Sequence, residues 1–371
     1  MTVIAAFKIS DTPVLIGDIL LSRSGKEESH IEIPTSDEVS SVLPEEWMRS
    51  VIGLYPKVAL INSSLAIGWT GQTFAAKALI KEIRARFEQP LFNSDVFFSF
   101  LKNNEIIDQT VELTIIGWVI NKGEPVSFYW SAKDLKVVKT KDTYIEGSGA
   151  VKFKEQLKNT EKVTEPATIR STESACLRAL SIVGSLLTEE VLFGNSIQDL
   201  YGGGYQIIVF DQGEFTFIDD YIVMPMQYEE TAHQGRESLR CTLPKYVLKH
   251  KYFNNTLIIS RFSIERPWHE LNKIFLVRDA QSNFIDISSD EKNSMLSLQA
   301  KFYSCFPFLI DIDGVIVLFQ TFSVPTSDKQ WIYLQNKENN QLLVFERRFI
   351  RFIVGHFERA MAKKYYHIDI N

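Results

Sequence analysis

Residues 2–21 read TVIAAFKISDTPVLIGDILL, and this stretch decides the fold class. Apolar side chains alternate at Val3, Ala5 and Phe7, which is the period of a β-strand with one buried face. A turn at Ser10–Thr12 separates this run from a second apolar run, so we expect a hairpin that begins at residue 2. The first residues of a chain are usually frayed and solvated. A strand that begins at residue 2 therefore raises the question of why the end of the chain is held in place.

Length and composition exclude several classes of protein. At 371 residues the chain is long for one domain, which favours two. A net charge of -6 gives no reason to expect nucleic acid, whose partners carry a basic surface. Cys176, Cys241 and Cys305 lie far apart without metal-ligand spacing, so we expect no metal and a reducing, cytoplasmic location. No secretory signal and no apolar run of about 18 residues is evident, so we expect no membrane partner.

The chain alternates between strand-like and helix-like patterns. Residues 22–47 are polar and are expected to form a long loop, with a candidate short helix at Pro44–Val51. Helical periodicity follows at residues 70–89. The residues expected on the buried face of that helix are Phe74, Ala78, Leu79, Ile83 and Phe87. The later expected elements are a helix at 93–104, a strand meander at 111–140, helices at 147–159 and 173–194, and a hairpin at 206–219.

These patterns predict an α+β protein with two domains. Over residues 1–220 we expect helices on both outer faces of stacked antiparallel sheets. Residues 221–371 are expected to form a C-terminal mixed, strand-rich extension of unknown role, ending in a helix over about 342–364. That helix would carry phenylalanines opposite arginines and lysines. A basic amphipathic helix can lie on a membrane or dock in a partner's groove, but more often it packs on its own domain.

Short motifs follow one another in a fixed order along the first part of the chain. They are Thr2 behind Met1, Asp18 in LIGD, Lys57 in KVALI, Gly71 in WTGQT, Ser148 in EGSGA and Asp199 in DLYGGG. With the order of strands and helices, they resemble the proteasome β-subunit family, the N-terminal-nucleophile (Ntn) hydrolases that include the bacterial HslV peptidase. The resemblance covers about residues 1–220 and implies a four-layer αββα Ntn-hydrolase sandwich there.

The resemblance implies that Thr2 is the nucleophile once Met1 has been removed. A hydroxyl needs a base to take its proton, and a free α-amine with a pKa of about 7.7–8.0 can serve. One residue then supplies both groups, which explains why a strand should begin at residue 2. Lys57 would lie beside the hydroxyl and lower its pKa, and Asp18 would pair with Lys57. We therefore expect Lys57→Ala to abolish turnover and leave thermal stability nearly unchanged.

The remaining motif residues are assigned by the same resemblance. The backbone N–H of Gly71 would stabilise the oxyanion, and Ser148 and Asp199 would orient the amine of Thr2. The chain departs from the family pattern at Gly202, which stands where the family has a serine. The loss of that hydroxyl would affect the catalytic efficiency more than the type of reaction. We therefore expect Gly202→Ser to increase the rate at which the site reacts.

The sequence leaves three functions open. The first is a threonine peptidase or amidohydrolase without a cofactor that acts on peptide or protein substrates. The resemblance also implies a homo-oligomeric ring and an ATP-dependent unfoldase as partners. The second is a catalytically inactive Ntn-fold scaffold or binding protein, and the third is a small-amide Ntn hydrolase. Taken singly, Asp18, Lys57 and Ser148 are more simply a strand-end carboxylate, a solvated lysine and a turn residue.

Overall fold

The computed structural model shows a mixed α+β chain with several sheets. It describes residues 2–25, 31–37, 39, 43, 49–89, 92–104, 106–140, 143–161, 171–233, 236–242, 246–253, 256–263, 272–278, 297–310, 316–318, 322–325, 332–337, 340–349, 351 and 355. The chain divides into two compact units after Ile218, close to the boundary expected at residue 220. The first comprises Met1–Ile218, Asn255–Leu257 and Val277–Asn283, and the second comprises Asp219–Asn254, Ile258–Leu276 and Phe284–Asn371.

One sheet of the first unit contains the opening hairpin. Its strand order is β10-β1-β2-β11-β12, and every neighbouring pair is antiparallel. These strands are β1 (Val3–Ile9), β2 (Thr12–Asp18), β10 (Tyr144–Gly147), β11 (Tyr205–Asp211) and β12 (Glu214–Phe217). The expected hairpin is therefore confirmed, and β1 lies inside the sheet rather than at its edge. This position, between β10 and β2, holds the chain immediately after Thr2.

A second sheet of this unit has the order β5-β6-β7-β8-β9 and is also antiparallel. Its strands are β5 (Val58–Asn62), β6 (Leu65–Gly71), β7 (Leu113–Asn121), β8 (Glu124–Ser131) and β9 (Val137–Thr140). A separate pair is formed by β3 (Leu20–Ser24) and β4 (Arg49–Leu54). The strand at Arg49–Leu54 overlaps the candidate helix at Pro44–Val51, so that helix is wrong over residues 49–51. Residues 44–48 lie outside the described residues.

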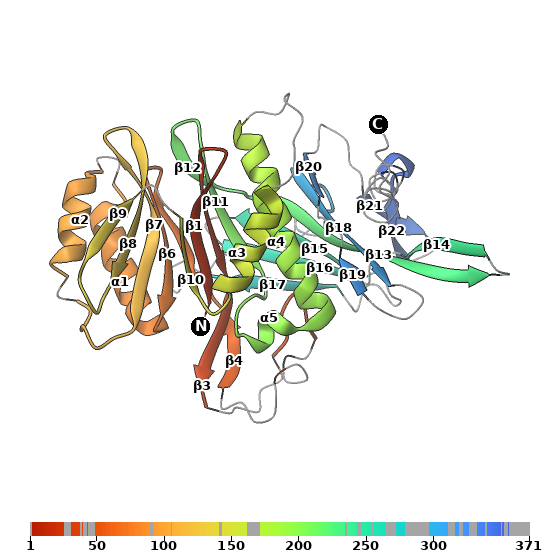
Figure 1. The fold of residues 1–371 in the computed structure, drawn as a ribbon, viewed down its shortest axis with the longest axis horizontal. Helices are drawn as coiled ribbons and strands as arrows, with labels where there is room; N and C mark the ends of the chain where they lie inside the picture. Colours follow the sequence, from red (N-terminus) through yellow and green to blue (C-terminus); the bar gives the residue numbers. More distant parts are fainter. Residues whose placement is uncertain are drawn as a thin grey trace. The chain divides into compact units, whose positions relative to one another are not determined.

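The helices of this unit are α1 (Thr73–Phe87), α2 (Ser94–Lys102), α3 (Ala150–Glu161), α4 (Ser171–Phe193) and α5 (Asn195–Gln198). Figure 1 shows α1 and α2 beside the β5–β9 sheet and α3 and α4 beside the sheet that contains β1. The two sheets pack on each other through a shared apolar cluster that includes Ile4, Ala6, Ala66 and Trp118. On its other face, β1 directs Phe7 against Phe153 of α3. Alternate side chains of β1 therefore point into two different apolar cores, one between the two sheets and one between this sheet and α3.

The buried face of α1 differs from the prediction. Phe74 is 86% exposed, although it was expected to be buried with the other apolar residues. The helix begins at Thr73, so Phe74 lies in its first turn and points away from the sheet. The face that is buried consists of Ala75, Ala76, Leu79, Ile80, Ile83 and Phe87. The helical period was therefore predicted correctly, but its phase in the first turn was not.

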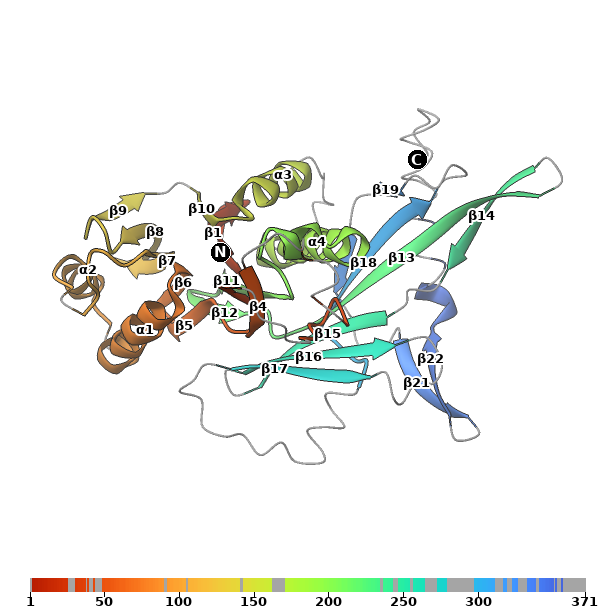
Figure 2. The ribbon, with the colours of Figure 1, turned by 90° about the horizontal axis from the view of Figure 1, so that it is seen from below.

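The second unit is built around a large sheet of order β17-β16-β15-β13-β18-β19. β13 also pairs with β14, and β18 with β20; Figure 2 shows the long β13 and β14. The strands are β13 (Asp220–His233), β14 (Arg236–Thr242), β15 (Tyr246–Phe253), β16 (Thr256–Ser263), β17 (Lys273–Val277), β18 (Phe302–Ile310), β19 (Ile316–Leu318) and β20 (Phe322–Pro325). β13 pairs antiparallel with β14 and β15, and β18 pairs antiparallel with β19 and β20. β13 and β18 pair in parallel.

The end of the chain differs from the expected helix over residues 342–364. A hairpin is formed by β21 (Ile332–Lys337) and β22 (Asn340–Phe345), so residues 342–345 are a strand. Residues 347–349, 351 and 355 are helical, and the others of the expected helix that follow residue 349 lie outside the described residues. Within the part of the chain that the structure describes, no helix is long and apolar enough to cross a membrane.

Candidate active site

Asp18, at the end of β2, is the centre of a buried cluster of hydrogen bonds. Its Oδ1 accepts from the Thr2 hydroxyl and from the backbone N–H of Val3 at 2.9 Å. Its Oδ2 accepts from the backbone N–H groups of Leu20 at 3.2 Å and Gly202 at 3.0 Å. Because β2 lies between β1 and β11, residues far apart in the sequence meet at this carboxylate. Their donated hydrogen bonds replace the water that Asp18 loses on burial.

Lys57 directly precedes β5 and supplies the counter-charge for Asp18. Its Nζ lies 3.0 Å from Oδ1 and 2.9 Å from Oδ2, and Lys57 and Asp18 are 1% and 0% exposed. Burial lowers the pKa of Lys57, and the Asp18 carboxylate partly opposes this by favouring the charged ammonium. The pair is therefore a buried salt bridge. Removing one partner leaves the other charge buried, so the expectation that Lys57→Ala spares stability no longer holds.

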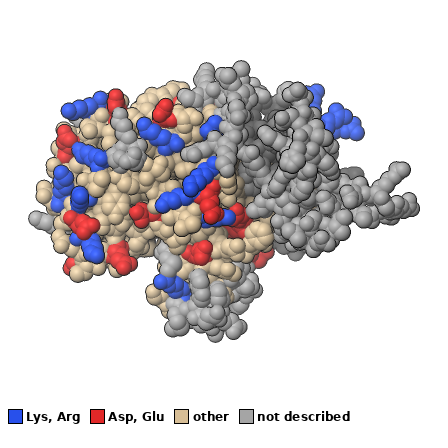
Figure 3. Space-filling model, viewed as in Figure 1, with Lys and Arg blue, Asp and Glu red and all other residues tan. Residues whose placement is uncertain are grey.

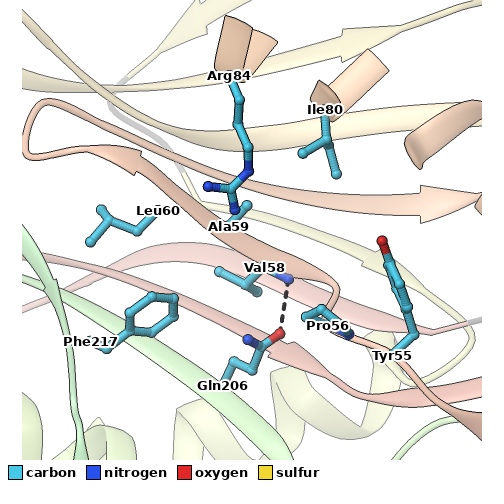
Figure 4. A pocket seen from close by; sticks show the side chains of 9 residues that line it. All are labelled: Tyr55, Pro56, Val58, Ala59, Leu60, Ile80, Arg84, Gln206 and Phe217. Atoms are coloured by element: carbon cyan, nitrogen blue, oxygen red, sulfur yellow. Dashed lines mark hydrogen bonds between the residues drawn. The ribbon is translucent and has the colours of Figure 1, made fainter. Parts of the chain in front are cut away.

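Gln206 of β11 fixes the backbone that carries Lys57. Its buried side-chain oxygen accepts from the backbone N–H of Lys57 at 3.0 Å and of Val58 at 3.1 Å. Figure 4 shows the second of these bonds, with the guanidinium of Arg84 directed toward Ala59. The pocket drawn there measures only about 20 Å³, so it can hold a water molecule but not a substrate side chain. Gln206 thus has a positioning role that the sequence motifs did not indicate.

The backbone carbonyl of Thr2 makes contacts in addition to the hydroxyl bond with Asp18. Its carbonyl accepts from the N–H of Gly149 at 3.3 Å, and the Ser148 hydroxyl lies 3.4 Å from the same oxygen. The Ser148 hydroxyl is closer to the backbone carbonyl of Asp199, at 2.7 Å. The structure thus brings Ser148 to Thr2, and Asp199 to Ser148, but Asp199 is exposed and takes part through its backbone. The roles expected for Ser148 and Asp199 toward the Thr2 amine stay predictions.

Gly71 lies at the end of β6, where the conformation of the backbone and the nearby Glu112 carbonyl require a glycine. Its φ is +109°, and a Cβ at this position would lie 2.1 Å from the carbonyl oxygen of Glu112. The next residue, Gln72, donates its backbone N–H to that same oxygen at 2.8 Å. The hydrogen bonds described for Asp18 do not involve Gly71. Its expected role as an oxyanion donor therefore stays a prediction.

Glu190, within α4, is a second buried carboxylate that was not predicted from the sequence. It is 2% exposed and accepts from the Ser196 hydroxyl at 2.7 Å, from the Gly203 N–H at 2.9 Å and from the Thr35 hydroxyl. The signal that could have revealed it is its place in a helix that is apolar over most of its circumference. A carboxylate there must be buried, and therefore needs donors. The neighbouring glycine run can supply them.

The position of Glu190 bears on the expected effect of a substitution at Gly202. Gly202 has φ +114°, and a Cβ there would lie 1.8 Å from Oε2 of Glu190. A serine at residue 202 would therefore collide with a buried carboxylate and strain the backbone. In a chain that retains Glu190, we therefore expect Gly202→Ser to destabilise this region rather than to accelerate the reaction.

The pH dependence of stability should report on Glu190. Burial raises the pKa of Glu190 from 4.5 to about 7, although the hydrogen bonds from Thr35, Ser196 and Gly203 oppose the shift. Between these values the folded chain holds a proton that the unfolded chain releases, so stability falls as pH rises from 4.5 to about 7. We expect the unfolding free energy of the wild type to fall by about 3 kcal/mol more than that of Glu190→Gln over this range. Urea unfolding at a series of pH values measures the difference, and parallel curves would contradict it.

The surface and the comparisons add few constraints. Figure 3 shows lysines and arginines interspersed with acidic residues over the described part of the visible face, without a broad basic area that would bind phosphates. Among the described residues, no group of three or more His, Cys, Asp or Glu could hold a metal ion. Comparison with protein-family models gave no match, and comparison with curated proteins gave none either.

Proposed function

We propose that this chain is a proteasome-like threonine peptidase or amidohydrolase, with Thr2 as nucleophile after removal of Met1. The observation that carries the proposal is the buried cluster of Thr2, Asp18 and Lys57. The Thr2 hydroxyl donates to Asp18, and both carboxylate oxygens of Asp18 contact the Lys57 ammonium. A hydroxyl and an ammonium that both contact one buried carboxylate are costly to bury for stability alone, which supports a chemical role.

The arrangement of the first unit supports the same proposal. Two antiparallel sheets pack on each other and helices lie against both outer faces, as a four-layer αββα Ntn sandwich requires. Thr2 immediately precedes a central strand of one sheet, and Lys57 immediately precedes the edge strand β5 of the other. A nucleophile held by sheet pairing is positioned more rigidly than one on a loop.

The proposed mechanism assigns one task to each group. The freed Thr2 amine takes the proton of the Thr2 hydroxyl, and the oxygen attacks the carbonyl carbon of an amide. The Lys57 ammonium stabilises the developing negative charge on that oxygen, and Asp18 holds Lys57 in place. The amide C–N bond then breaks and its nitrogen leaves with a proton, which gives an acyl-enzyme that water hydrolyses. We place this activity in the cytoplasm, without a cofactor, and a homo-oligomeric ring and an ATP-dependent unfoldase remain proposals from the family resemblance.

Chemical labelling of Thr2 tests the proposal. An N-terminal threonine offers a hydroxyl and an amine, and a peptide epoxyketone reacts with both in turn to form a ring. We expect stoichiometric labelling of the Thr2 peptide, measured by mass spectrometry, in protein whose intact mass shows that Met1 has been removed. A hydrolase whose serine or cysteine lies inside the chain lacks the second nucleophile, so the ring adduct would be specific for an N-terminal nucleophile.

The matched control is Thr2→Ala, which should remain unlabelled. Protein that retains Met1 should also remain unlabelled, because its Thr2 nitrogen is an amide and cannot act as the base. Absence of labelling in Met1-free protein across a range of peptide warheads would contradict the peptidase. Acyl-amide substrates would then test whether the chain is a small-amide hydrolase.

A second candidate function is a non-catalytic Ntn-fold scaffold. Two observations favour it: Thr2 is 1% exposed, and Glu190 fills the space beside Gly202 where the family has a serine. The resemblance would then reflect the fold alone, and the buried ion pair would serve only assembly of the two sheets. Release of Met1 distinguishes the candidates, since a scaffold has no need of a free Thr2 amine. Natively expressed protein that fully retains Met1 would support the scaffold.

A further inference from the structure

One glycine bend connects two buried carboxylates. The N–H of Gly202 donates to Oδ2 of Asp18 at 3.0 Å. The next N–H, from Gly203, lies 2.9 and 3.1 Å from the two oxygens of Glu190. Asp18 and Glu190 are 0% and 2% exposed, so both bonds are shielded from water. Two consecutive backbone donors therefore face opposite ways, one toward the Thr2 cluster and one toward α4.

Glu190 also binds two other segments. It accepts from the Ser196 hydroxyl of α5 and from the Thr35 hydroxyl, which belongs to the polar segment between β3 and β4. That segment is anchored independently by apolar contacts. Its residues Ile33 and Val39 belong to a buried cluster with Leu20, Val51, Ile197 and Leu200. Glu190 thus joins three chain segments at one point beside the candidate active site.

A side chain at residue 202 requires the Glu190 carboxylate to move from its position. A Cβ on residue 202 would lie 1.8 Å from Oε2 of Glu190 and 3.2 Å from the Ser196 hydroxyl. The family serine and the α4 carboxylate therefore compete for one space. In this chain the carboxylate occupies it, and residue 202 is a glycine with φ +114°.

We propose that Glu190 is a positioning residue for the Thr2–Asp18–Lys57 site, and that it acts by holding the 202–203 bend. This inference rests on the proposed function. The carboxylate binds the Gly203 N–H, and the Gly202 carbonyl of the same peptide unit accepts from the N–H of Ile19 at 3.3 Å. These two bonds hold the bend in the conformation from which the preceding N–H, that of Gly202, donates to Asp18. Without Glu190 the bend loses its anchor, and the Asp18 carboxylate loses one of the donors that fix its orientation toward Lys57 and Thr2.

Two substitutions of Glu190 test this inference in Met1-free protein. Glu190→Ala removes the acceptor, and Glu190→Gln keeps an oxygen that can accept from Gly203. We expect Glu190→Ala to slow the maximal rate of epoxyketone labelling by about tenfold or more, with little change in the concentration needed for half-maximal rate. Glu190→Gln should recover most of the rate. This rescue distinguishes positioning of the site from loss of substrate binding.

Ile83→Ala in α1 provides the matched control for destabilisation. Ile83 is buried on the other side of the β5–β9 sheet, so its loss creates a cavity without touching the bend. We expect Ile83→Ala to lower the melting temperature and to leave the labelling rate within about twofold of the wild type. Equal slowing by Ile83→Ala and Glu190→Ala would show that instability alone explains the effect, and would overturn the inference.

Hydrogen exchange provides a readout that does not depend on activity. We expect Glu190→Ala to increase exchange at the amides of Gly202 and Gly203, while β1 and β2 stay protected. If the wild type does not label, the proposed function fails, but this exchange result still decides whether Glu190 holds the bend. Unchanged exchange at both amides overturns the inference, whether or not Thr2 reacts. If Glu190→Ala increases exchange at these amides but leaves the labelling rate unchanged, the inference is also overturned, because the bend would then not position the site.

Discussion

Lys57→Ala is expected to lower the free energy of unfolding by about 3–5 kcal/mol and to abolish labelling of Thr2. The loss of stability follows from burial, since Asp18 is 0% exposed and would lose the ammonium that compensates its buried carboxylate. Its remaining donors are the Thr2 hydroxyl and three backbone N–H groups, which carry no full positive charge. The loss of reactivity follows because no cation would stabilise the developing alkoxide. Urea unfolding followed by circular dichroism measures the first effect.

Two further variants separate stability from chemistry. Lys81→Ala removes a lysine from the exposed side of α1 and should change the unfolding free energy by about 0.5 kcal/mol or less. The double variant Asp18→Asn with Lys57→Met removes both charges, so it should recover much of the lost stability but none of the labelling. A single Lys57→Ala variant as stable as Lys81→Ala would contradict the buried pair. Labelling that survives in Lys57→Ala would contradict its role in the reaction.

Gly202→Ser is the second change with a large expected effect. Its backbone has φ +114°, which costs a residue with a side chain about 1–3 kcal/mol. Its Cβ would also approach Oε2 of Glu190 to 1.8 Å, so the carboxylate must move away from its buried donors. We expect a total loss of about 3 kcal/mol or more in unfolding free energy, together with slower labelling of Thr2.

Gly213→Ser is the matched control, because Gly213 has φ +91° but a Cβ there would meet nothing within 4 Å. Gly213→Ser introduces the same kind of backbone strain without the collision. It should therefore lower the unfolding free energy by about 1–3 kcal/mol and leave the labelling of Thr2 unchanged. Combining Gly202→Ser with Glu190→Ala removes the collision and restores a hydroxyl where the family has one. The double variant should therefore be more stable than Gly202→Ser alone. Equal stability of the two serine variants at 202 and 213 would show that Glu190 does not occupy this space.

The local elements of the first unit could be predicted from the sequence. Alternation at Val3, Ala5 and Phe7 identified β1, because a strand presents every second side chain to one side regardless of its partners. The helical period of α1 was found for the same reason. Phe74 was misplaced because the phase of a first turn depends on where the helix begins. Residues 342–345 formed a strand because pairing with β21 overrides a local helical pattern.

The sequence also predicted that Thr2, Asp18 and Lys57 share one candidate site, but only because its motifs resemble those of the Ntn hydrolases. It could not tell whether Lys57 is solvated or buried, because that depends on the packing of β5 against a sheet formed by distant residues. The tertiary structure shows that the expected pair of Lys57 and Asp18 is buried, with direct consequences for stability. It alone revealed that Glu190 occupies the space beside Gly202. Local periodicity encodes which elements form, whereas the burial of a polar group is determined by partners far along the chain.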